Sequence, residues 1–423
     1  MLDPSLAALT TLFGPEFGHG KAFELARLRI ALGALGAPQE NLPPIFHVAG
    51  TNGKGSTIAF MRAIAEAAGL SVHAFTKPHL LQLNERFCVA GAIVETDALI
   101  AGAERVARVA PGLTQFEAQV AIAFLLFAES PADLCLIEAG MGGRDDATNV
   151  ILAPALSVIT PIALDHQEIL GPTLAHIASH KAGILKAHFA AIVARQAREV
   201  MEIIEAEAAL VGAPLWRQGA EWDAHASGGR LLVQTQSQVL DLPLPALAGA
   251  HQIDNAGLAI AALLASNCGF EESAIARGIE TAAWPGRLQP ITRGALWRAA
   301  RGVELWIDGG HNAHAARALA RALAEMNCKR PARTALIIGI RARKDWRGFL
   351  DELARAADLV IAVPLAHESA NPADLAAYAQ ALGVASSAAH DLGGAISQAR
   401  AANTTRVLVC GSLQVAADAL ARS

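Results

Sequence analysis

Residues 45–57 read IFHVAGTNGKGST, a mainly apolar run followed directly by a glycine-rich turn that carries a lysine. The run at 45–49 is typical of a strand buried in a parallel sheet. We expect a helix over 57–68 after the turn, with Gly69 as its C-cap. Strand, glycine turn and helix in this order form the setting in which backbone N–H groups and a helix N-terminus bind phosphate. The stretch therefore predicts an α/β domain that binds a nucleotide.

The turn departs from the strict P-loop pattern, because Gly55 stands at its hydroxyl position and Val48 at its first glycine position. Ser56 follows one residue late, so an ordinary glycine-rich turn is the alternative interpretation. We favour phosphate binding because Lys54 adds positive charge for the β and γ oxygens. The residues expected to contact ATP in this segment are Asn52, Gly53, Lys54, Gly55, Ser56 and Thr57.

Outside this stretch, apolar runs alternate with Ala- and Leu-rich helical stretches, as in a parallel sheet covered by helices on both faces. Between Pro214 and Pro245 the pattern changes to short strand-like pieces around residues 227–229, which predict a hairpin in a small antiparallel appendage. The further runs of the first series lie at 72–75, 134–137, 156–160 and 191–194.

A chain of 423 residues can bury more than one core, because single cores stop growing near roughly 250–300 residues. The segment WPGR at 284–287 interrupts the first series, and a second βα series follows it. We therefore expect a P-loop parallel-sheet ATPase domain at 1–289 and a C-terminal Rossmann-like α/β domain at 290–423. The runs of the second series lie at 305–308, 335–339, 359–363 and 407–410.

Composition narrows the class of protein. The five cysteines are scattered and never form a CxxC pair, so neither a disulfide framework nor a zinc site is expected. Met1 to Glu16 lacks a basic leader region and no apolar run reaches the roughly 18 residues of a membrane span. A net charge of -5 without a Lys/Arg cluster argues against a nucleic-acid partner. We expect a cytoplasmic monomer with small-molecule substrates and no membrane partner.

One carboxylate and one imidazole side chain follow predicted strands of the first series. Glu138 ends the run at 134–137 and opens a glycine-rich loop at 139–149, and His166 follows the run at 156–160. Parallel α/β sheets bind ligands at this carboxyl edge, and oxygen and imidazole donors suit Mg²⁺. A divalent ion would offset the negative charge of a bound nucleotide's phosphates. A structural role is the alternative for each residue alone.

Several segments in order resemble the folylpolyglutamate synthase and dihydrofolate synthase family of the Mur ligase superfamily, over about Phe23 to Ser412. The resemblance implies an ATP-dependent ligase that joins L-glutamate to dihydropteroate, to reduced folates, or to both, through an acyl phosphate, with Mg²⁺ as cofactor. It also implies that the C-terminal domain binds glutamate. The segments that carry it are GTNGKGS (50–56), TQFE (114–117), ITPIALDH (159–166), KAGI (181–184), WPGR (284–287) and DGGHN (308–312).

The resemblance assigns roles to individual residues. Lys181 would be carbamylated, which requires the neutral amine and gives an anionic oxygen donor; a solvent-facing helix lysine is the alternative. The implied catalytic residues are Lys54, Lys181, His166 and Arg287, the further ATP ligands are Asn255, Arg287 and Asp308, and the metal ligands are Glu138 and His166. The implied substrate-binding residues are Phe116, Glu117, Arg144, Asp145, Asp146, His311 and Ser412, of which the last two would position glutamate.

Two residues depart from the family pattern in charge. Lys77 replaces a serine metal ligand, and Asp145 replaces a leucine in the segment that lines the pterin site. Because an ammonium and a metal ion repel, Lys77 either turns away or points inward toward the γ-phosphate, which is the pose we expect. These departures leave two alternatives open, a Mur-type ligase with another carboxylate acceptor and a nucleotide-binding paralogue without catalysis.

Overall fold

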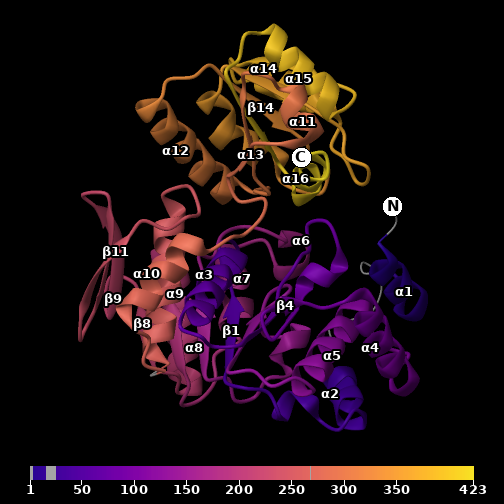
Figure 1. The fold of residues 1–423 in the computed structure, drawn as a ribbon, viewed down its shortest axis with the longest axis vertical. Helices are drawn as coiled ribbons and strands as arrows, with labels where there is room; N and C mark the ends of the chain where they lie inside the picture. The colour runs from indigo at the N-terminus through magenta and orange to yellow at the C-terminus, as the bar shows by residue number, and fades with distance from the viewer. Residues whose placement is uncertain (1–2, 16–24, 267) are drawn as a thin grey trace. The chain divides into compact units, whose positions relative to one another are not determined.

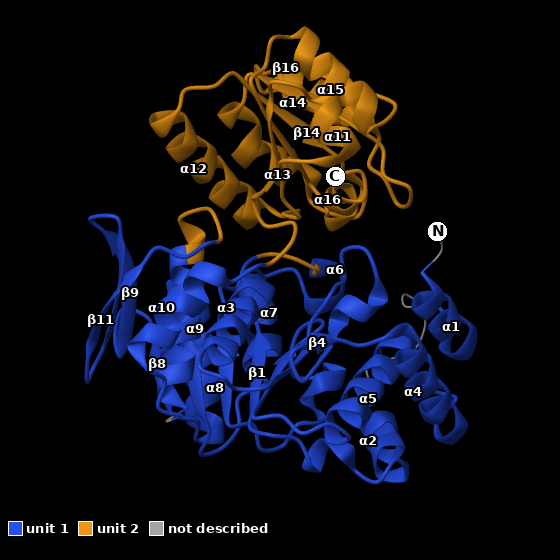
Figure 2. Cartoon of the chain, in the orientation of Figure 1, with its two compact units in different colours: residues 1–163, 167–246, 253–283 blue, residues 164–166, 247–252, 284–423 orange. Residues whose placement is uncertain are grey.

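The computed structural model describes residues 3–15, 25–266 and 268–423, so Met1, Glu16 and Phe23 of the sequence argument lie outside the described residues. The chain divides into two compact units (Figure 2). Unit 1 comprises residues 1–163, 167–246 and 253–283, and unit 2 comprises 164–166, 247–252 and 284–423.

The described part of unit 1 contains an eight-stranded sheet in the order β4-β3-β2-β5-β1-β6-β7-β8. Neighbouring strands from β2 to β8 pair in parallel, whereas β3 pairs antiparallel with both β2 and β4. The strands are β1 (Ile45–Ala49), β2 (Val72–Phe75), β3 (Phe87–Val89), β4 (Ala92–Ile93), β5 (Leu134–Glu138), β6 (Leu156–Ile159), β7 (Ala190–Val193) and β8 (Leu215–Arg217).

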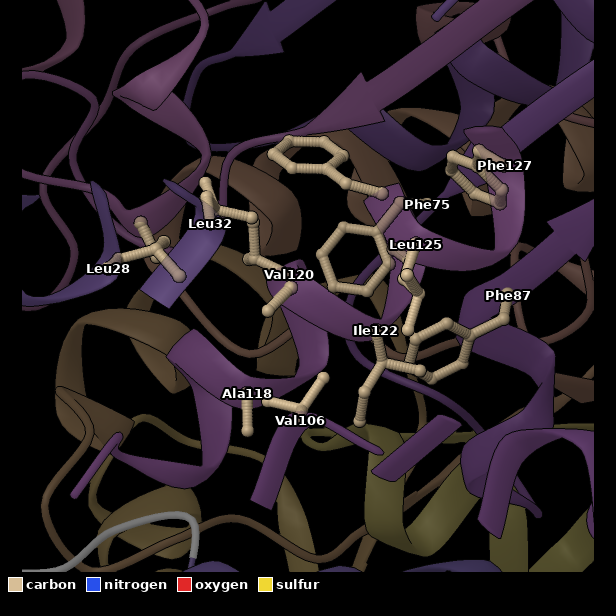
Figure 3. Packing of buried hydrophobic residues seen from close by; sticks show 14 of the residues in the cluster. Leu28, Leu32, Phe75, Phe87, Val106, Ala118, Val120, Ile122, Leu125 and Phe127 are labelled. Atoms are coloured by element: carbon tan, nitrogen blue, oxygen red, sulfur yellow. The ribbon is translucent and has the colours of Figure 1, made fainter. Parts of the chain in front are cut away.

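Helices cover this sheet (Figure 1). One apolar core packs α1, α2, α4 and α5 against β2 and β5, and another packs α7 and α8 against β6 and β7. In the first core, Val120 and Ile122 of α5 lie beside Phe75 and Phe87 (Figure 3). The helices are α1 (Pro4–Phe13), α2 (Leu25–Ala34), η1 (Pro38–Glu40), α3 (Lys54–Ala67), η2 (Leu83–Arg86), α4 (Thr96–Val109), α5 (Gln115–Ala128), η3 (Ala147–Val150), α6 (Gln167–Leu170), α7 (Leu174–Ala182), α8 (Arg198–Val211), α9 (His251–Ala265) and α10 (Glu272–Thr281).

The small antiparallel sheet predicted from the sequence is present as β9 (Trp222–Ser227), β10 (Arg230–Thr235) and β11 (Val239–Pro243). Gly228 and Gly229 both have positive φ, as a two-residue hairpin turn requires. The expectation was wrong for the start of the segment, since Leu215–Arg217 forms β8 and pairs in parallel with β7 of the large sheet. Three residues are too short for periodicity to show which sheet they join.

Unit 2, which is described throughout, has a six-stranded sheet in the order β12-β13-β17-β14-β15-β16, with β12 antiparallel and the others parallel. This confirms the predicted α/β class. The strands are β12 (Gln289–Ile291), β13 (Glu304–Ile307), β14 (Thr334–Ile338), β15 (Leu359–Ala362), β16 (Ala385–Ala388) and β17 (Arg406–Cys410). The helices are α11 (Gly294–Ala299), α12 (Ala313–Lys329), α13 (Trp346–Leu353), η4 (Ala354–Ala356), α14 (Pro372–Ala381), α15 (Leu392–Ala401) and α16 (Leu413–Leu420).

The helix after the glycine turn begins at Lys54, three residues before the start expected from the sequence. Gly53 is its N-cap and has a φ of 90°, so the turn itself leads directly into the helix. The backbone N–H groups of the first helical turn therefore belong to the GKGS segment, as anion binding at a helix N-terminus requires. Within the described ranges, no helix combines the length and apolar composition needed to cross a lipid bilayer.

Close packing of α10 on α3 gives a stability prediction. A Cβ atom at Gly278 in α10 would collide with the backbone of Ile64 in α3, whereas Gly33 in α2 has open space beside it. We expect Gly278→Ala to lower the free energy of unfolding by about 1–3 kcal/mol through overpacking. Gly33→Ala is the matched control and should raise it by up to about 1 kcal/mol through helix propensity. Urea unfolding of both variants measures the difference, and equal midpoints would contradict the packing.

Candidate active site

The glycine turn is fixed by the chain that follows β6. The backbone N–H of Thr51 donates to the carbonyl of Pro161 at 3.0 Å, and its hydroxyl donates to the carbonyl of Ala163 at 3.0 Å. Gly50 has a φ of 147°, and a Cβ atom there would collide with Thr160. The turn therefore requires glycine at position 50 and is rigid before any ligand arrives.

Two ammonium groups converge on this turn. Lys54 Nζ donates to the carbonyl oxygens of Gly50 at 3.2 Å and Thr51 at 3.3 Å. Lys181 Nζ of α7, a buried side chain, donates to the same Gly50 oxygen at 2.6 Å. Asn255 of α9 lies against Gly53, so closely that a Cβ atom at Gly53 would meet its amide oxygen. Three of the residues predicted for the site thus contact the turn.

Glu138 ends β5 with its carboxylate almost fully buried. Its Oε1 lies 3.7 Å from Lys54 Nζ, and its Oε2 accepts a hydrogen bond of 2.9 Å from the backbone N–H of Lys77. Because β5 lies between β1 and β2 in the sheet, Glu138 lies between the glycine turn after β1 and the residues after β2. The carboxylate is therefore held from both neighbouring strands.

Lys77 places its ammonium on an aromatic ring. Its Nζ lies 4.2 Å from the centroid of the Phe116 ring, at the start of α5. The Phe116 ring packs so closely on Gly140, two residues after Glu138, that any side chain at position 140 would collide with it. Phe116 therefore contacts both Lys77 and the start of the 139–149 loop.

The loop at 139–149 is anchored by Asp146. The Asp146 carboxylate accepts from the backbone N–H of Met141 at 2.7 Å, and from the N–H and hydroxyl of Thr148 at 3.0 and 2.6 Å. Since the Thr148 hydroxyl gives its hydrogen to Asp146, it accepts from His47 Nε2, which lies 2.8 Å away on β1. Burial, and then the charge of Lys186, lower the pKa of His47 to about 3. Neutral His47 thus ties the loop to the central strand.

The other predicted substrate residues of unit 1 contact protein groups. Glu117 closes a capping box with Thr114 at the start of α5 and pairs with Arg27 at 2.7 Å. Arg144 pairs with Glu207 of α8 at 2.7 Å. Asp145, whose side chain is 51% exposed, lies 3.7 Å from His180 Nδ1. If Glu117 or Arg144 contacts substrate, it does so while it is also paired with Arg27 or Glu207.

In unit 2, Asp308 follows β13 and accepts from the backbone N–H groups of Leu288 at 2.8 Å and Gly310 at 2.6 Å. Arg287 donates to the carbonyl of Gly286 at 3.0 Å and lies next to Gly309. Ser412 is the N-cap of α16 and accepts from the N–H of Val415 at 3.0 Å. Asp308 and Ser412 thus follow the ends of β13 and β17, and Arg287 precedes β12.

In unit 2, Asp165 contacts several basic side chains, which was not predicted from the sequence. It lies 2.5 Å from Lys344 Nζ and 3.3 Å from His311 Nε2, and Asn312 donates to it at 3.2 Å. Burial raises the pKa of Asp165, but the hydrogen bond and charge of His311, with the charges of Lys344 and His166, hold it well below its usual range. The sequence showed an Asp and a His at 165–166. It did not show the partners of Asp165, because they lie about 150 residues or more further along the chain.

His166 and Glu138 lie in different units, and the described residues contain no group of three or more His, Cys, Asp or Glu side chains placed to hold a metal. The donors nevertheless suit a hard divalent ion that takes other ligands from phosphates. In unit 1, the hydroxyl oxygen of Thr57, in the first turn of α3, is buried with no hydrogen-bond partner among the described residues. In unit 2, the Lys344 ammonium donates to His166 Nε2 at 3.4 Å.

Comparison with known proteins defines the class. Residues 48–263 match the Mur ligase middle domain, and residues 286–413 match the Mur ligase glutamate ligase domain. The dihydrofolate synthase/folylpolyglutamate synthase of Escherichia coli is 34% identical over 410 residues, covering 95% of this chain and 92% of that protein. The Bacillus subtilis protein of the same name is 34% identical over 71% of each chain. The chain belongs to the folylpolyglutamate synthase and dihydrofolate synthase family, which confirms the resemblance seen in the sequence.

Solved structures of related proteins have the same fold as this chain. E. coli FolC in complex with DHPP and ADP has a TM-score of 0.87 at 31% identity, covering 100% of this chain and 98% of that one. The bifunctional Yersinia pestis enzyme complexed with AMPPNP and Mn ion has a TM-score of 0.87 at 30% identity, covering 100% and 99%. A bifunctional synthase with Mn, AMPPNP and L-glutamate bound has a TM-score of 0.85 at 31% identity, covering 99% and 98%. All three structures contain a nucleotide, and the latter two also contain Mn.

The His47 contact predicts a pH dependence of stability. His47 has its folded-state pKa lowered from 6.5 to about 3, so between these values the unfolded chain binds a proton that the folded chain does not. Stability from neutral His47 is therefore present above about pH 6.5 and is lost as the pH falls toward 3. We expect His47→Gln to reduce the slope with which the free energy of unfolding falls at acid pH, by up to about 1.4 kcal/mol per pH unit.

Urea unfolding between pH 7 and pH 4 measures this slope. His225→Gln is the control, because His225 is exposed on β9 and its loss should leave the wild-type slope unchanged. A wild-type slope in His47→Gln would show that His47 is not held neutral by burial.

Proposed function

We propose that this protein is an ATP-dependent ligase that joins L-glutamate to dihydropteroate, and to reduced folates, through an acyl phosphate. The observation that carries the proposal is the buried Glu138 carboxylate beside Lys54 at the glycine turn, in a chain of this family. The relatives' complexes with ADP, AMPPNP, DHPP and L-glutamate name the matching ligands.

ATP takes the turn at Asn52–Thr57 in this proposal. The first-turn N–H groups of α3 and the Lys54 ammonium receive the β and γ phosphates. Arg287 adds a second cation for the phosphates. Asn255 and Asp308 complete the nucleotide contacts. Mg²⁺ would be held by Glu138, His166 and phosphate oxygens, and would offset phosphate charge.

The chemistry then has two steps. An acceptor carboxylate oxygen attacks the γ-phosphorus, the bond from that phosphorus to the β–γ bridging oxygen breaks, and ADP leaves. The amino nitrogen of glutamate attacks the carbonyl carbon of the acyl phosphate and loses a proton. Inorganic phosphate departs with the former carboxylate oxygen, and the amide remains. Lys54 stabilises the charge that develops on the phosphoryl oxygens because it is fixed before the reaction.

Lys181 is proposed to react with carbon dioxide as its neutral amine, forming a carbamate and releasing a proton. Its Nζ is buried and 2.6 Å from the Gly50 carbonyl, so it is not the solvent-facing lysine of the alternative interpretation. A carbamate there would place an oxygen donor beside the turn.

The acceptor and glutamate sites are assigned to different units. Phe116, Asp145 and Asp146 of unit 1, with Glu117 and Arg144, are proposed to shape the acceptor site. His311 and Ser412 of unit 2 are proposed to position glutamate, with Asp165 orienting His311. We also propose the functional boundary at 289/290, a monomeric state and cytoplasmic action without nucleic acid; the free thiols of Cys88, Cys135, Cys268, Cys328 and Cys410 support a reducing compartment.

Lys54→Met tests the nucleotide assignment. We expect ADP formation in the presence of dihydropteroate and glutamate to fall by roughly 10²- to 10³-fold, as for the loss of one preorganised electrostatic group. Lys329→Met, at the exposed end of α12, is the control and should retain wild-type turnover.

Omitting each substrate from the wild-type assay separates the proposed function from the two alternatives. ADP release without dihydropteroate or folate would indicate another acceptor, and none with any mixture would indicate a paralogue without catalysis.

Ser412→Ala tests the glutamate assignment. We expect the KM for glutamate to rise roughly tenfold while the KM for ATP stays near wild type, because one hydrogen bond to a charged ligand is lost. The variant also loses the α16 N-cap, so Asn371→Ala, which removes the N-cap of α14, is the matched control. His311→Ala should behave as Ser412→Ala does. A rise in the KM for ATP alone would move both residues to the nucleotide site.

A further inference from the structure

The two oxygens of Glu138 divide the catalytic edge of unit 1 into two sides. Oε1 lies toward Lys54 of the glycine turn, and Oε2 is bound by the backbone N–H of Lys77. The sheet order β2-β5-β1 produces this division, because the turn follows β1 and Lys77 follows β2. Lys77 therefore lies on the side of Glu138 opposite to the phosphate-binding turn.

The Lys77 ammonium is held in place on that side. Its Nζ lies over the Phe116 ring at 4.2 Å, a cation–π contact. Phe116 is fixed in turn, since its ring packs on the backbone of Gly140 and lies 6.2 Å from the Phe75 ring. The backbone N–H of Lys77 is tied to Glu138. Backbone and side chain are thus both positioned, as a preorganised charge requires.

Each side of Glu138 then has its own cation. Lys54 contacts the turn, where it supplies charge for phosphates. Lys77 supplies charge on the side of Phe116 and the 139–149 loop. An ammonium has no lone pair to donate to a metal, so a ligand suited to Lys77 is an anion. The anion that must approach the γ-phosphate from outside the turn is a carboxylate.

We propose that Lys77 binds the acceptor carboxylate that becomes the acyl phosphate. This inference rests on the proposed function and names a specificity-determining residue for it. The ammonium holds the carboxylate against the phosphoryl group, where two anions would otherwise repel. The Phe116 ring keeps the ammonium directed to that position. The enzyme therefore prefers acceptors with a free carboxylate because of Lys77.

The test compares binding of pteroate and its methyl ester, which carries no negative charge at the carboxyl group. Isothermal titration calorimetry in the presence of AMPPNP gives both affinities for wild type and for Lys77→Met. Methionine matches the lysine stem as far as Cε without the ammonium, keeps the backbone N–H to Glu138 and can still pack on Phe116. We expect wild type to prefer the acid by roughly ten- to hundredfold, and Lys77→Met to lose most of this preference while its AMPPNP affinity stays unchanged.

Lys329→Met is the control for the substitution itself and should keep the wild-type preference. Retention of the acid preference in Lys77→Met would overturn the proposal, as would failure of wild type to discriminate acid from ester or to bind either. A fall in AMPPNP affinity equal to the fall in pteroate affinity would also overturn it, by placing Lys77 on the phosphates. Wild-type ligation of glutamate to dihydropteroate is measured separately, so loss of the Lys77 assignment and loss of the proposed function remain distinguishable.

Discussion

The active edge of unit 1 depends on one buried carboxylate. An unpaired carboxylate is costly to bury, and Glu138 is compensated by Lys54 on one oxygen and the Lys77 N–H on the other. These partners follow β1 and β2, the strands on either side of β5, so the contact also sets where the two loops lie. The same geometry leaves oxygen atoms at the edge of the sheet, where a divalent ion and phosphates would meet.

Rigidity around this carboxylate comes from backbone constraints and buried hydrogen bonds. Gly50 and Gly53 permit approaches to Thr160 and Asn255 that a side chain would block, and Gly140 does the same for Phe116. Neutral His47 and the Asp146 carboxylate fix the adjacent loop through Thr148. The groups are therefore arranged before substrate binds, which lets fixed charges act on the transition state without reorganisation.

The sequence predicted the elements whose signal is local. The strand at 45–49, the glycine turn, the helix after it and the Gly228–Gly229 hairpin follow from glycine positions and apolar runs, although the helix begins three residues earlier than expected. Family motifs supplied the candidate residues. Long-range pairings could not be predicted. His47 meets Thr148 across 101 residues, and Lys344 meets Asp165 across 179. Likewise, the cation–π contact of Lys77 depends on how α5 packs beside β2, and the parallel pairing of β8 depends on tertiary context.

The central claim is that the acceptor carboxylate is activated as an acyl phosphate at this edge, and isotope transfer tests it most directly. Dihydropteroate labelled with oxygen-18 in its carboxylate is incubated with ATP and L-glutamate, and the inorganic phosphate is analysed by mass spectrometry. The account predicts one labelled oxygen in the phosphate for each amide formed, because the phosphate departs with the former carboxylate oxygen. Amide formation with unlabelled phosphate would contradict it.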